Sequence, residues 1–334
     1  MKTALLDVPF VRQHHLTCVP ATLAALARFW RCSADHLAIA DRICYDGTRA
    51  HASREWARQQ GWEAREFTVT WDATVDLCDR GVPFIVDTIQ ATSAHAQAIV
   101  GYDLRRGTLF IRDPYLPTLV EVLAVQFFEQ YAAHGPRGFA VVPAEQAARL
   151  HGLELPESEL YANLERIEAA LEVHDRASAS AAASELQKQA PGHRLAILGR
   201  RALANYDENP FEQLAAADAG LVLFPGEPTW LLQRLSALRA NSSSARVAQE
   251  LEAIHADDSA HPVFRELLAA ELSGDARELP RAMRLLRRVA RQLRDRSATL
   301  TALAECHWTL REFEHSLGLY RLAATLDTTS ERAA

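Results

Sequence analysis

The pattern of apolar residues changes near residue 143, and this change most constrains what the chain can fold into. Before it, helical periodicity gives way to short β-branched segments; after it, residues 145–334 are rich in Ala, Leu, Glu and Arg at helical spacing. A chain of 334 residues also exceeds what one ordinary hydrophobic core holds. We therefore predict two domains, residues 1–145 and residues 146–334.

The first segment predicts helices followed by an antiparallel sheet. Apolar residues three and four positions apart predict helices over residues 19–31, 34–43 and 52–60. Short β-branched segments bounded by Gly, Pro or Asp predict strands at residues 82–88, 97–103, 108–112 and 138–142. The Arg-Arg-Gly between Asp103 and Thr108 is typical of a hairpin turn. Helices first and strands afterwards indicate an α+β domain.

Small residues recur with a period of 34 in the second segment. One series contains Ala202, Ser236, Ala270 and Ala304; a second contains Ala248, Ala282 and Ser316. The last unit, which also carries Tyr320 and Ala323, resembles a tetratricopeptide repeat, whose small residues allow two helices to pack closely. Pro191 and Pro225 fall near the ends of earlier units. A generic helical bundle that matches these positions by chance is the alternative.

Charge and hydropathy exclude several classes of partner. The net charge is −7, and neither segment is basic, which argues against nucleic-acid binding. No stretch of eighteen apolar residues is present, so no membrane span is predicted. The N-terminal MKTALLDVPF lacks the apolar region of a signal peptide, which predicts a cytoplasmic protein.

The cysteines indicate free thiols. The chain has five, at positions 18, 32, 44, 78 and 306, and no two of them have CxxC spacing. An odd number without such spacing argues against a disulfide framework or a zinc ribbon. His14 and His15 lie close to Cys18, but adjacent histidines cannot easily face one ion. We therefore predict no metal and no cofactor.

Four residues of the first segment have the types and positions that a cysteine nucleophile requires. Cys18 lies at the start of a predicted helix, where N–H groups and the helix dipole favour a thiolate. His95 begins one predicted strand and Asp113 follows the next, so hairpin pairing could bring them to one edge of the sheet. Gln13 could donate to an oxyanion. Taken singly, each residue type also has an ordinary structural role.

Five separated motifs resemble those of one family. The segment VPFVRQHHLTCVPATLAALARFW resembles the start of the bacterial double-glycine leader peptidases, a papain-like family often found at the N-terminus of bacteriocin-exporting ABC transporters. AHAQAIVGYD and IRDPY resemble its His strand and its Asp-Pro, and LVEVLAVQFFEQY and RGFAVVP resemble its closing elements. The resemblance covers about residues 7–143. It implies a papain-like cysteine-protease fold with catalytic roles for Cys18 (nucleophile), His95 (base), Asp113 (orienting group) and Gln13 (oxyanion donor).

The sequence departs from the family pattern on both sides of the cysteine. Val19 stands where the family usually has Gly, and Thr17 stands where it often has Asp. Because Gly permits backbone shapes that Val resists, the oxyanion hole could differ, and the domain could bind peptide without cutting it. The chain also has no GxxxxGK[ST] motif, so the transporter role of the family is not carried over.

These observations favour a cysteine peptidase whose helical-repeat domain recruits a peptide or protein. Two alternatives stay open. The first is a catalytically inactive, peptidase-like protein that acts as a peptide- or protein-binding module. The second is an acyl or amide transferase that uses the same Cys18, because it would share the covalent step with a hydrolase.

Overall fold

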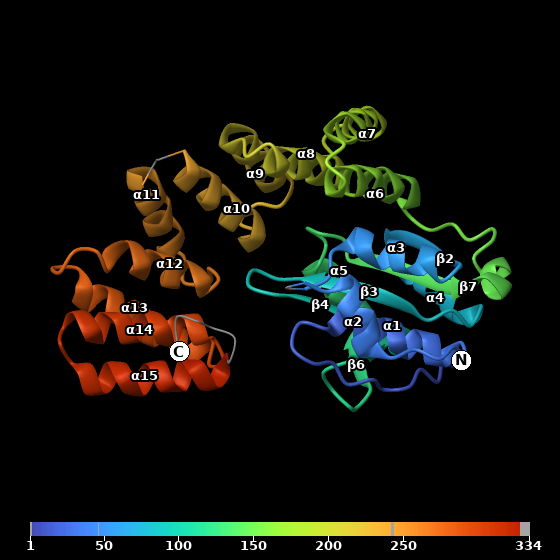
Figure 1. Cartoon of the computed structure of the whole chain (residues 1–334), viewed down its shortest axis with the longest axis horizontal. Helices are drawn as coiled ribbons and strands as arrows, with labels where there is room; N and C mark the ends of the chain where they lie inside the picture. The colour runs from blue at the N-terminus through green and yellow to red at the C-terminus, as the bar shows by residue number, and fades with distance from the viewer. Residues whose placement is uncertain (1, 46, 242–243, 328–334) are drawn as a thin grey trace. The chain divides into compact units, whose positions relative to one another are not determined.

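The structure is a computed structural model that describes residues 2–45, 47–241 and 244–327. The chain divides into two compact units, Met1–Glu227 and Pro228–Ala334. The change from sheet to helices comes after Pro143, close to the predicted domain boundary, but the first helices beyond it belong to the same compact unit as the sheet (Figure 1).

The N-terminal part is an α+β fold with an antiparallel sheet, as predicted. Its helices are α1 (Cys18–Phe29), α2 (His36–Ile43), α3 (Ala50–Gln59), α4 (Trp71–Asp79) and α5 (Ala124–Gln130). Its strands are β1 (Thr3–Leu5), β2 (Trp62–Thr68), β3 (Phe84–Ile89), β4 (Ala94–Asp103), β5 (Thr108–Arg112), β6 (Val120–Leu123) and β7 (Arg137–Pro143). The periodicity analysis did not find β2 and α4, and charged residues interrupt the apolar pattern of β2.

The strands form one sheet in the order β2-β7-β3-β4-β5-β6, and β1 pairs with β4. A bulge in β4 lies between Ile99 and Gly101. A Cβ atom at Gly101 would lie 2.1 Å from the carbonyl oxygen of Ala4, so only glycine lets β1 approach this closely. Side chains of α1, α2 and α3 cover one face of the sheet, and those of α4 and α5 cover the other.

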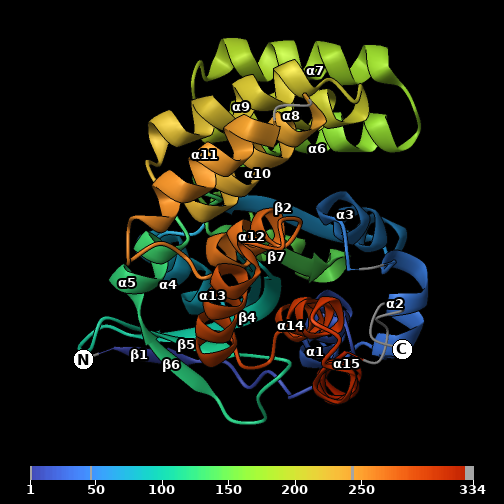
Figure 2. The ribbon, with the colours of Figure 1, turned by 90° about the vertical axis from the view of Figure 1, so that its left-hand side faces the viewer.

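Helical hairpins follow the sheet within the same unit. A short 3₁₀ helix (Ala144–Arg149) leads to α6 (Ser158–Glu172), α7 (Arg176–Gln189), α8 (Arg194–Tyr206) and α9 (Pro210–Leu223). The side chains of Asp175 and Asn209 cap α7 and α9, and Pro210 occupies the first turn of α9. Helix α6 packs on α3 and β2, and α7 and α8 pack on α6 (Figure 2).

All the secondary-structure elements in the described residues of the second unit are helices. It contains α10 (Pro228–Ala240), α11 (Ser244–His255), α12 (Val263–Leu272), α13 (Leu279–Gln292), α14 (Ser297–Thr309) and α15 (Phe313–Leu326). Successive helices pack on one another, and α13 buries an apolar face that includes Leu279, Leu286 and Val289. Across the part of the chain that the structure describes, no helix has the length and hydropathy needed to cross a membrane.

The strict period of 34 does not place all the small residues at helix contacts. Ser236 and Ala270 are exposed, whereas their neighbours Ala237 and Ala269 are fully buried. One residue corresponds to a rotation of about 100° around a helix, so a slip of a single position moves a residue off the contact face. In the last hairpin the small residues do meet: the Ser316 hydroxyl donates to the Ala304 carbonyl at 2.8 Å.

Candidate active site

Cys18 is the first residue of α1, and the side chain before it leaves the helix end uncapped. The hydroxyl of Thr17 accepts a hydrogen bond from the His14 N–H at 2.8 Å and donates to the His14 carbonyl at 3.2 Å. Thr17 therefore makes no side-chain cap to α1. The N–H groups of a first helical turn have no partner within the helix, so those of Cys18 and Val19 are left without a side-chain acceptor from Thr17.

The turn before Cys18 is held in an unusual backbone conformation. Leu16 has a φ of 58°, in the left-handed region that residues other than glycine rarely adopt. Its carbonyl accepts a hydrogen bond from the Cys44 thiol at 3.2 Å, and the rings of His14 and His36 stack 5.1 Å apart. The surrounding contacts thus fix a turn that leads the chain directly into α1.

The structure brings His95 and Asp113 together. His95 lies near the start of β4, and Asp113 directly follows β5, its antiparallel neighbour. His95 Nε2 is 2.8 Å from Asp113 Oδ1, and the same oxygen accepts from the Tyr115 N–H at 2.8 Å. An interaction with the Cys18 side chain also contributes to the raised pKa of His95. Because Nε2 faces Asp113, Nδ1 is the ring nitrogen that remains for Cys18.

The surroundings favour a protonated imidazole and an ionised carboxylate. Burial lowers the pKa of His95, but interactions with the side chains of Asp113 and Cys18 outweigh it and raise the pKa to about 9. Burial raises the pKa of Asp113, but hydrogen bonds from His95 and the Tyr115 N–H lower it below its ordinary value. The imidazole is therefore held as a cation next to the Cys18 sulfur at neutral pH.

A threonine that the sequence analysis did not single out links the cysteine to the histidine strand. The Thr22 side chain is buried within α1 and donates to the Cys18 carbonyl at 2.8 Å and to the Ala96 carbonyl at 3.2 Å. On the other side of β4, the Thr88 hydroxyl donates to the His95 carbonyl at 3.1 Å. These bonds fix the start of α1 relative to His95. The only sequence signal for Thr22 is a hydroxyl within an otherwise apolar helix.

Gln13 is attached to the segment that carries the carboxylate. Its backbone N–H donates to the Pro114 carbonyl at 3.0 Å, directly after Asp113. Within the described residues, the buried Oε1 atom of Gln13 has no hydrogen-bond partner. No hydrogen bond to this oxygen fixes the Gln13 side chain in place. This leaves it available to a ligand.

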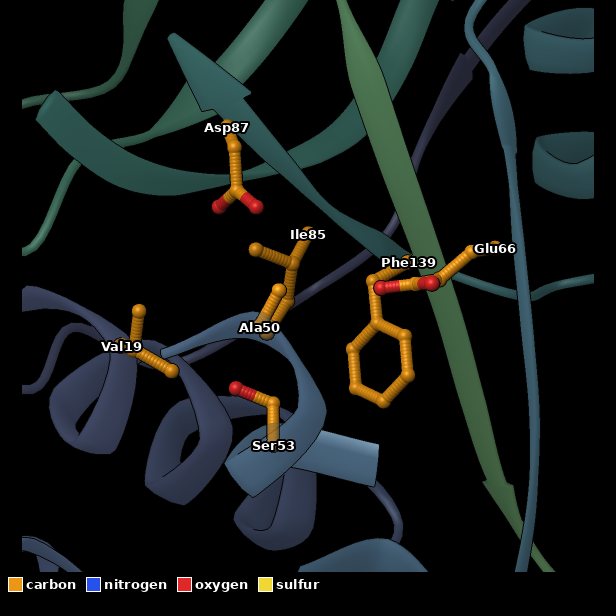
Figure 3. Close-up of a pocket in the computed structure, with 7 residues that line it drawn as sticks. All are labelled: Val19, Ala50, Ser53, Glu66, Ile85, Asp87 and Phe139. Carbon is orange, nitrogen blue, oxygen red and sulfur yellow. The ribbon is translucent and has the colours of Figure 1, made fainter. Parts of the chain in front are cut away.

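Val19 is a regular helical residue, so its branched side chain fits the backbone without strain. Its side chain lines a small pocket (Figure 3) whose other walls are Ala50, Ser53, Glu66, Ile85, Asp87 and Phe139.

The carboxyl groups of the pocket belong to a buried ionic cluster. Burial raises the pKa of Asp87 to about 6. Arg137 and His95 lower this pKa, and Glu66 raises it, but burial has the largest effect. Asp87 lies opposite Ala96 in the β3–β4 ladder, beside the histidine strand. A carboxyl group that titrates near neutrality thus lies close to the candidate catalytic residues.

The environments of three other thiols suppress their reactivity. Each of the five cysteines is free. Burial raises the pKa of Cys78 to about 12 and also raises the pKa of Cys32 and of Cys306. Cys18 differs from these three because its side chain interacts with that of His95. The arrangement of Cys18, His95 and Asp113 has the parts needed for nucleophilic attack on a carbonyl carbon.

Comparison with known proteins gives the same class for this part of the chain. Residues 5–137 match the Peptidase_C39 like family. Among solved structures, the peptidase domain of Streptococcus ComA, described as a bifunctional ABC transporter involved in a quorum-sensing pathway, is 23% identical and covers 41% of this chain and 99% of that domain, with a TM-score of 0.36. No curated protein matches the chain. The N-terminal part is therefore similar to the Peptidase_C39 like family.

Proposed function

We propose that the chain is a cysteine peptidase with Cys18 as its nucleophile. The observation that carries the proposal is the position of His95, whose imidazole is hydrogen-bonded to Asp113 and interacts with the side chain of Cys18 at the start of α1. A thiolate paired with an imidazolium is the reactive form of a catalytic cysteine. The similarity of residues 5–137 to the Peptidase_C39 like family supports the same activity.

In the proposed reaction, the Cys18 thiolate attacks the carbonyl carbon of the scissile amide. His95 then donates its proton to the leaving amine as the C–N bond breaks, and a thioester remains on Cys18. Water, deprotonated by His95, attacks the thioester and releases the acid and the thiol. Asp113 keeps the ring oriented and stabilises its cationic form throughout.

The oxyanion of each tetrahedral intermediate needs hydrogen-bond donors. The uncapped N–H groups at the start of α1 supply one set, because the Thr17 hydroxyl is turned to His14. The Gln13 side-chain amide supplies another, from a loop that is bonded to the residue after Asp113. Donors that are already in place at the developing charge account for a large part of catalysis in acyl transfer.

The helical hairpins would recruit the substrate or a partner protein as tetratricopeptide-like repeats. Helices α8, α10, α12 and α14 begin at residues 194, 228, 263 and 297, which are 34, 35 and 34 residues apart. Stacked hairpins of this length form extended binding surfaces in repeat proteins. Binding of a leader-type peptide to Cys18→Ala, measured by fluorescence anisotropy, should weaken when α10–α15 are removed.

The first test is the pH dependence of alkylation by iodoacetamide, followed at each cysteine by peptide mapping. We expect Cys18 to react fast below pH 7, and His95→Ala to abolish this reactivity because the thiolate loses its counter-ion. Cys44, which is also partly exposed, is the matched thiol within the same sample. If Cys18 reacts no faster than Cys44, or is indifferent to His95, the resting site is not activated and the N-terminal part is a binding fold.

The second test is hydrolysis of peptides that contain a Gly-Gly site, with matched peptides that lack it. We expect Cys18→Ala to abolish cleavage and kcat/KM to fall above about pH 9, because His95 must be protonated to supply the leaving amine. Release of a trapped thioester by added amines faster than by water would instead identify a transferase.

A further inference from the structure

The turn between α14 and α15 gathers two histidines and a glutamate. His307 lies in the last turn of α14, Glu312 immediately precedes α15, and His315 lies in the first turn of α15. One ligand atom from each of the three side chains lies within 4.8 Å of the other two. The cluster belongs to the second unit, whereas Cys18 belongs to the first.

The tight turn explains why these side chains converge. Arg311 has a φ of 62°, and the Glu312 N–H donates to the His307 carbonyl at 2.9 Å, so the chain reverses directly after α14. The Glu312 side chain does not cap α15, although it occupies the capping position. It is turned back so that its Oε2 lies 2.5 Å from Nδ1 of His307. The rings of His307 and His315 stack 5.5 Å apart at 23°.

We propose that His307, Glu312 and His315 bind a divalent transition-metal ion such as Zn²⁺. Imidazole nitrogen and carboxylate oxygen are ordinary zinc ligands, and two histidines with one glutamate leave a coordination position for water. With metal–ligand bonds of about 2.0–2.1 Å, tetrahedral ligand atoms lie about 3.3 Å apart. The ligand atoms must therefore rearrange on binding, and His307 Nδ1 and Glu312 Oε2, which are 2.5 Å apart, must separate slightly to hold an ion between them.

The different burial of the three residues allows that rearrangement. His307 is buried and fixed in the hairpin, whereas Glu312 and His315 are exposed and can rotate towards it. The bound ion would join the end of α14 to the start of α15. A ligand that binds only the folded state raises the apparent stability, so the metal would act as a staple of this hairpin.

A simple hydrogen bond between His307 and Glu312 is the competing explanation of the geometry, since a histidine near a helix C-terminus is favourable by itself. His315 separates the two explanations. It takes no part in the His307–Glu312 bond, but it is required for a three-ligand site. Because His315 is exposed, His315→Ala removes a ligand without opening the hydrophobic core.

The experiment is a titration of the metal-free, reduced full chain with Co²⁺, read from its visible absorption. It is carried out in a Cys18→Ser background, so that the candidate active site offers no thiolate. We expect one equivalent to produce d–d bands without a thiolate charge-transfer band, and excess Zn²⁺ to displace it. His315→Ala should weaken binding by more than about tenfold, Glu312→Gln should weaken it as well, and His151→Ala, which alters an exposed histidine elsewhere, should not.

A second readout is the thermal midpoint of the same proteins with and without Zn²⁺. Zinc should raise the midpoint of the Cys18→Ser chain and of its His151→Ala variant but not of its His315→Ala variant. Equal Co²⁺ affinity in the His315→Ala and His151→Ala variants, or no d–d bands at micromolar metal, would overturn the proposal. Neither readout involves Cys18, so the result is independent of the proposed peptidase activity.

Discussion

One cluster of Arg–Glu pairs in the first unit is buried around Glu66, whereas the Arg281–Glu252 pair of the second unit lies near the surface. Glu66 on β2 is 3% exposed and accepts from Arg137 Nε and Nη2 at 2.9 and 2.6 Å, and it also pairs with Arg54. In the second unit, Arg281 and Glu252 pair at 2.6 Å with side chains that are 36% and 42% exposed. The same two residue types therefore serve different purposes in the two regions.

The buried cluster depends on charges from α6. Arg54 pairs with Glu165 at 3.0 Å, and Arg137 lies 3.9 Å from Glu168. Burial lowers the pKa of Arg137, but Glu66, Glu168 and Asp87 outweigh it and raise it. Without α6, the arginines of α3 and β7 would lose two of their carboxylates, so the first hairpin completes the electrostatics of the sheet.

Helix α8 is attached to the sheet in the same way. Arg194 is buried and donates to the Thr68 hydroxyl and to the Glu157 carboxylate, and its Nη1 donates to the Tyr161 hydroxyl at 3.3 Å. The Thr68 N–H donates to the Pro156 carbonyl at 2.9 Å, which occupies part of the exposed edge of β2. Buried charge pairs of this kind specify how elements dock, whereas exposed pairs contribute little.

The largest expected effect comes from removing the hairpins that neutralise the cluster. A chain that ends after residue 150 keeps the whole sheet but lacks Glu165 and Glu168. We expect it to lose cooperative unfolding and to aggregate, whereas residues 1–227 should fold. Circular dichroism and size-exclusion chromatography check this. Equal thermal midpoints for the two truncated chains would instead support the predicted boundary between residues 145 and 146, and the buried cluster would then not need the hairpins.

A point substitution should give the next largest effect. Glu66→Ala leaves the guanidinium groups of Arg54 and Arg137 buried without their shared carboxylate, and we expect a loss of about 3–5 kcal/mol in the free energy of unfolding. Urea denaturation measures it. The matched control is Glu271→Ala, which removes the partner of Arg239 in the second unit. Similar losses for both variants would show that burial does not separate the two regions.

Asp87→Asn should stabilise the protein in a pH-dependent manner. The pKa of Asp87 is raised to about 6 in the folded state, against about 3.9 in the unfolded chain. The stability contributed by its proton is fully present below about pH 3.9 and is lost as the pH rises through 6. The amide of the variant cannot titrate, so the variant should match the parent near pH 4 and exceed it by about 2–3 kcal/mol at pH 7.5. Thermal denaturation across this range is the measurement; an advantage that shrinks with rising pH would contradict it.

The smallest effect should come from a pair in the second unit. Glu252→Ala removes the partner of Arg281, and we expect a change of about 0–1 kcal/mol that shrinks as salt is added. Urea denaturation at low and high ionic strength checks this. A salt-independent loss as large as that of Glu66→Ala would mean that this surface pair is as essential as the buried cluster.

The sequence alone predicted the α+β part, the helical part and the order of the main elements. Periodicity located α1, α2, α3, β3, β4, β5 and β7, because local spacing reports which face of an element is apolar. The hairpin between β4 and β5 also predicted that His95 and Asp113 could meet, since antiparallel strands joined by a short turn have a defined register. Cys18 at a helix start followed from the same local pattern.

Contacts between distant segments were decided only by the tertiary structure. Glu and Arg usually lie at the surface, and nothing in the local sequence of Glu66 or Arg137 indicates that they are buried together. The proximity of Arg137 to Glu168 on α6 is equally absent from the local sequence. The bond from Thr22 to the Ala96 carbonyl and the meeting of His307 with His315 likewise depend on how helices pack. Local sequence determines which face of a helix or strand is apolar. The partner of a buried polar group is determined by packing between distant segments, because any complementary charge at the right place can satisfy that group.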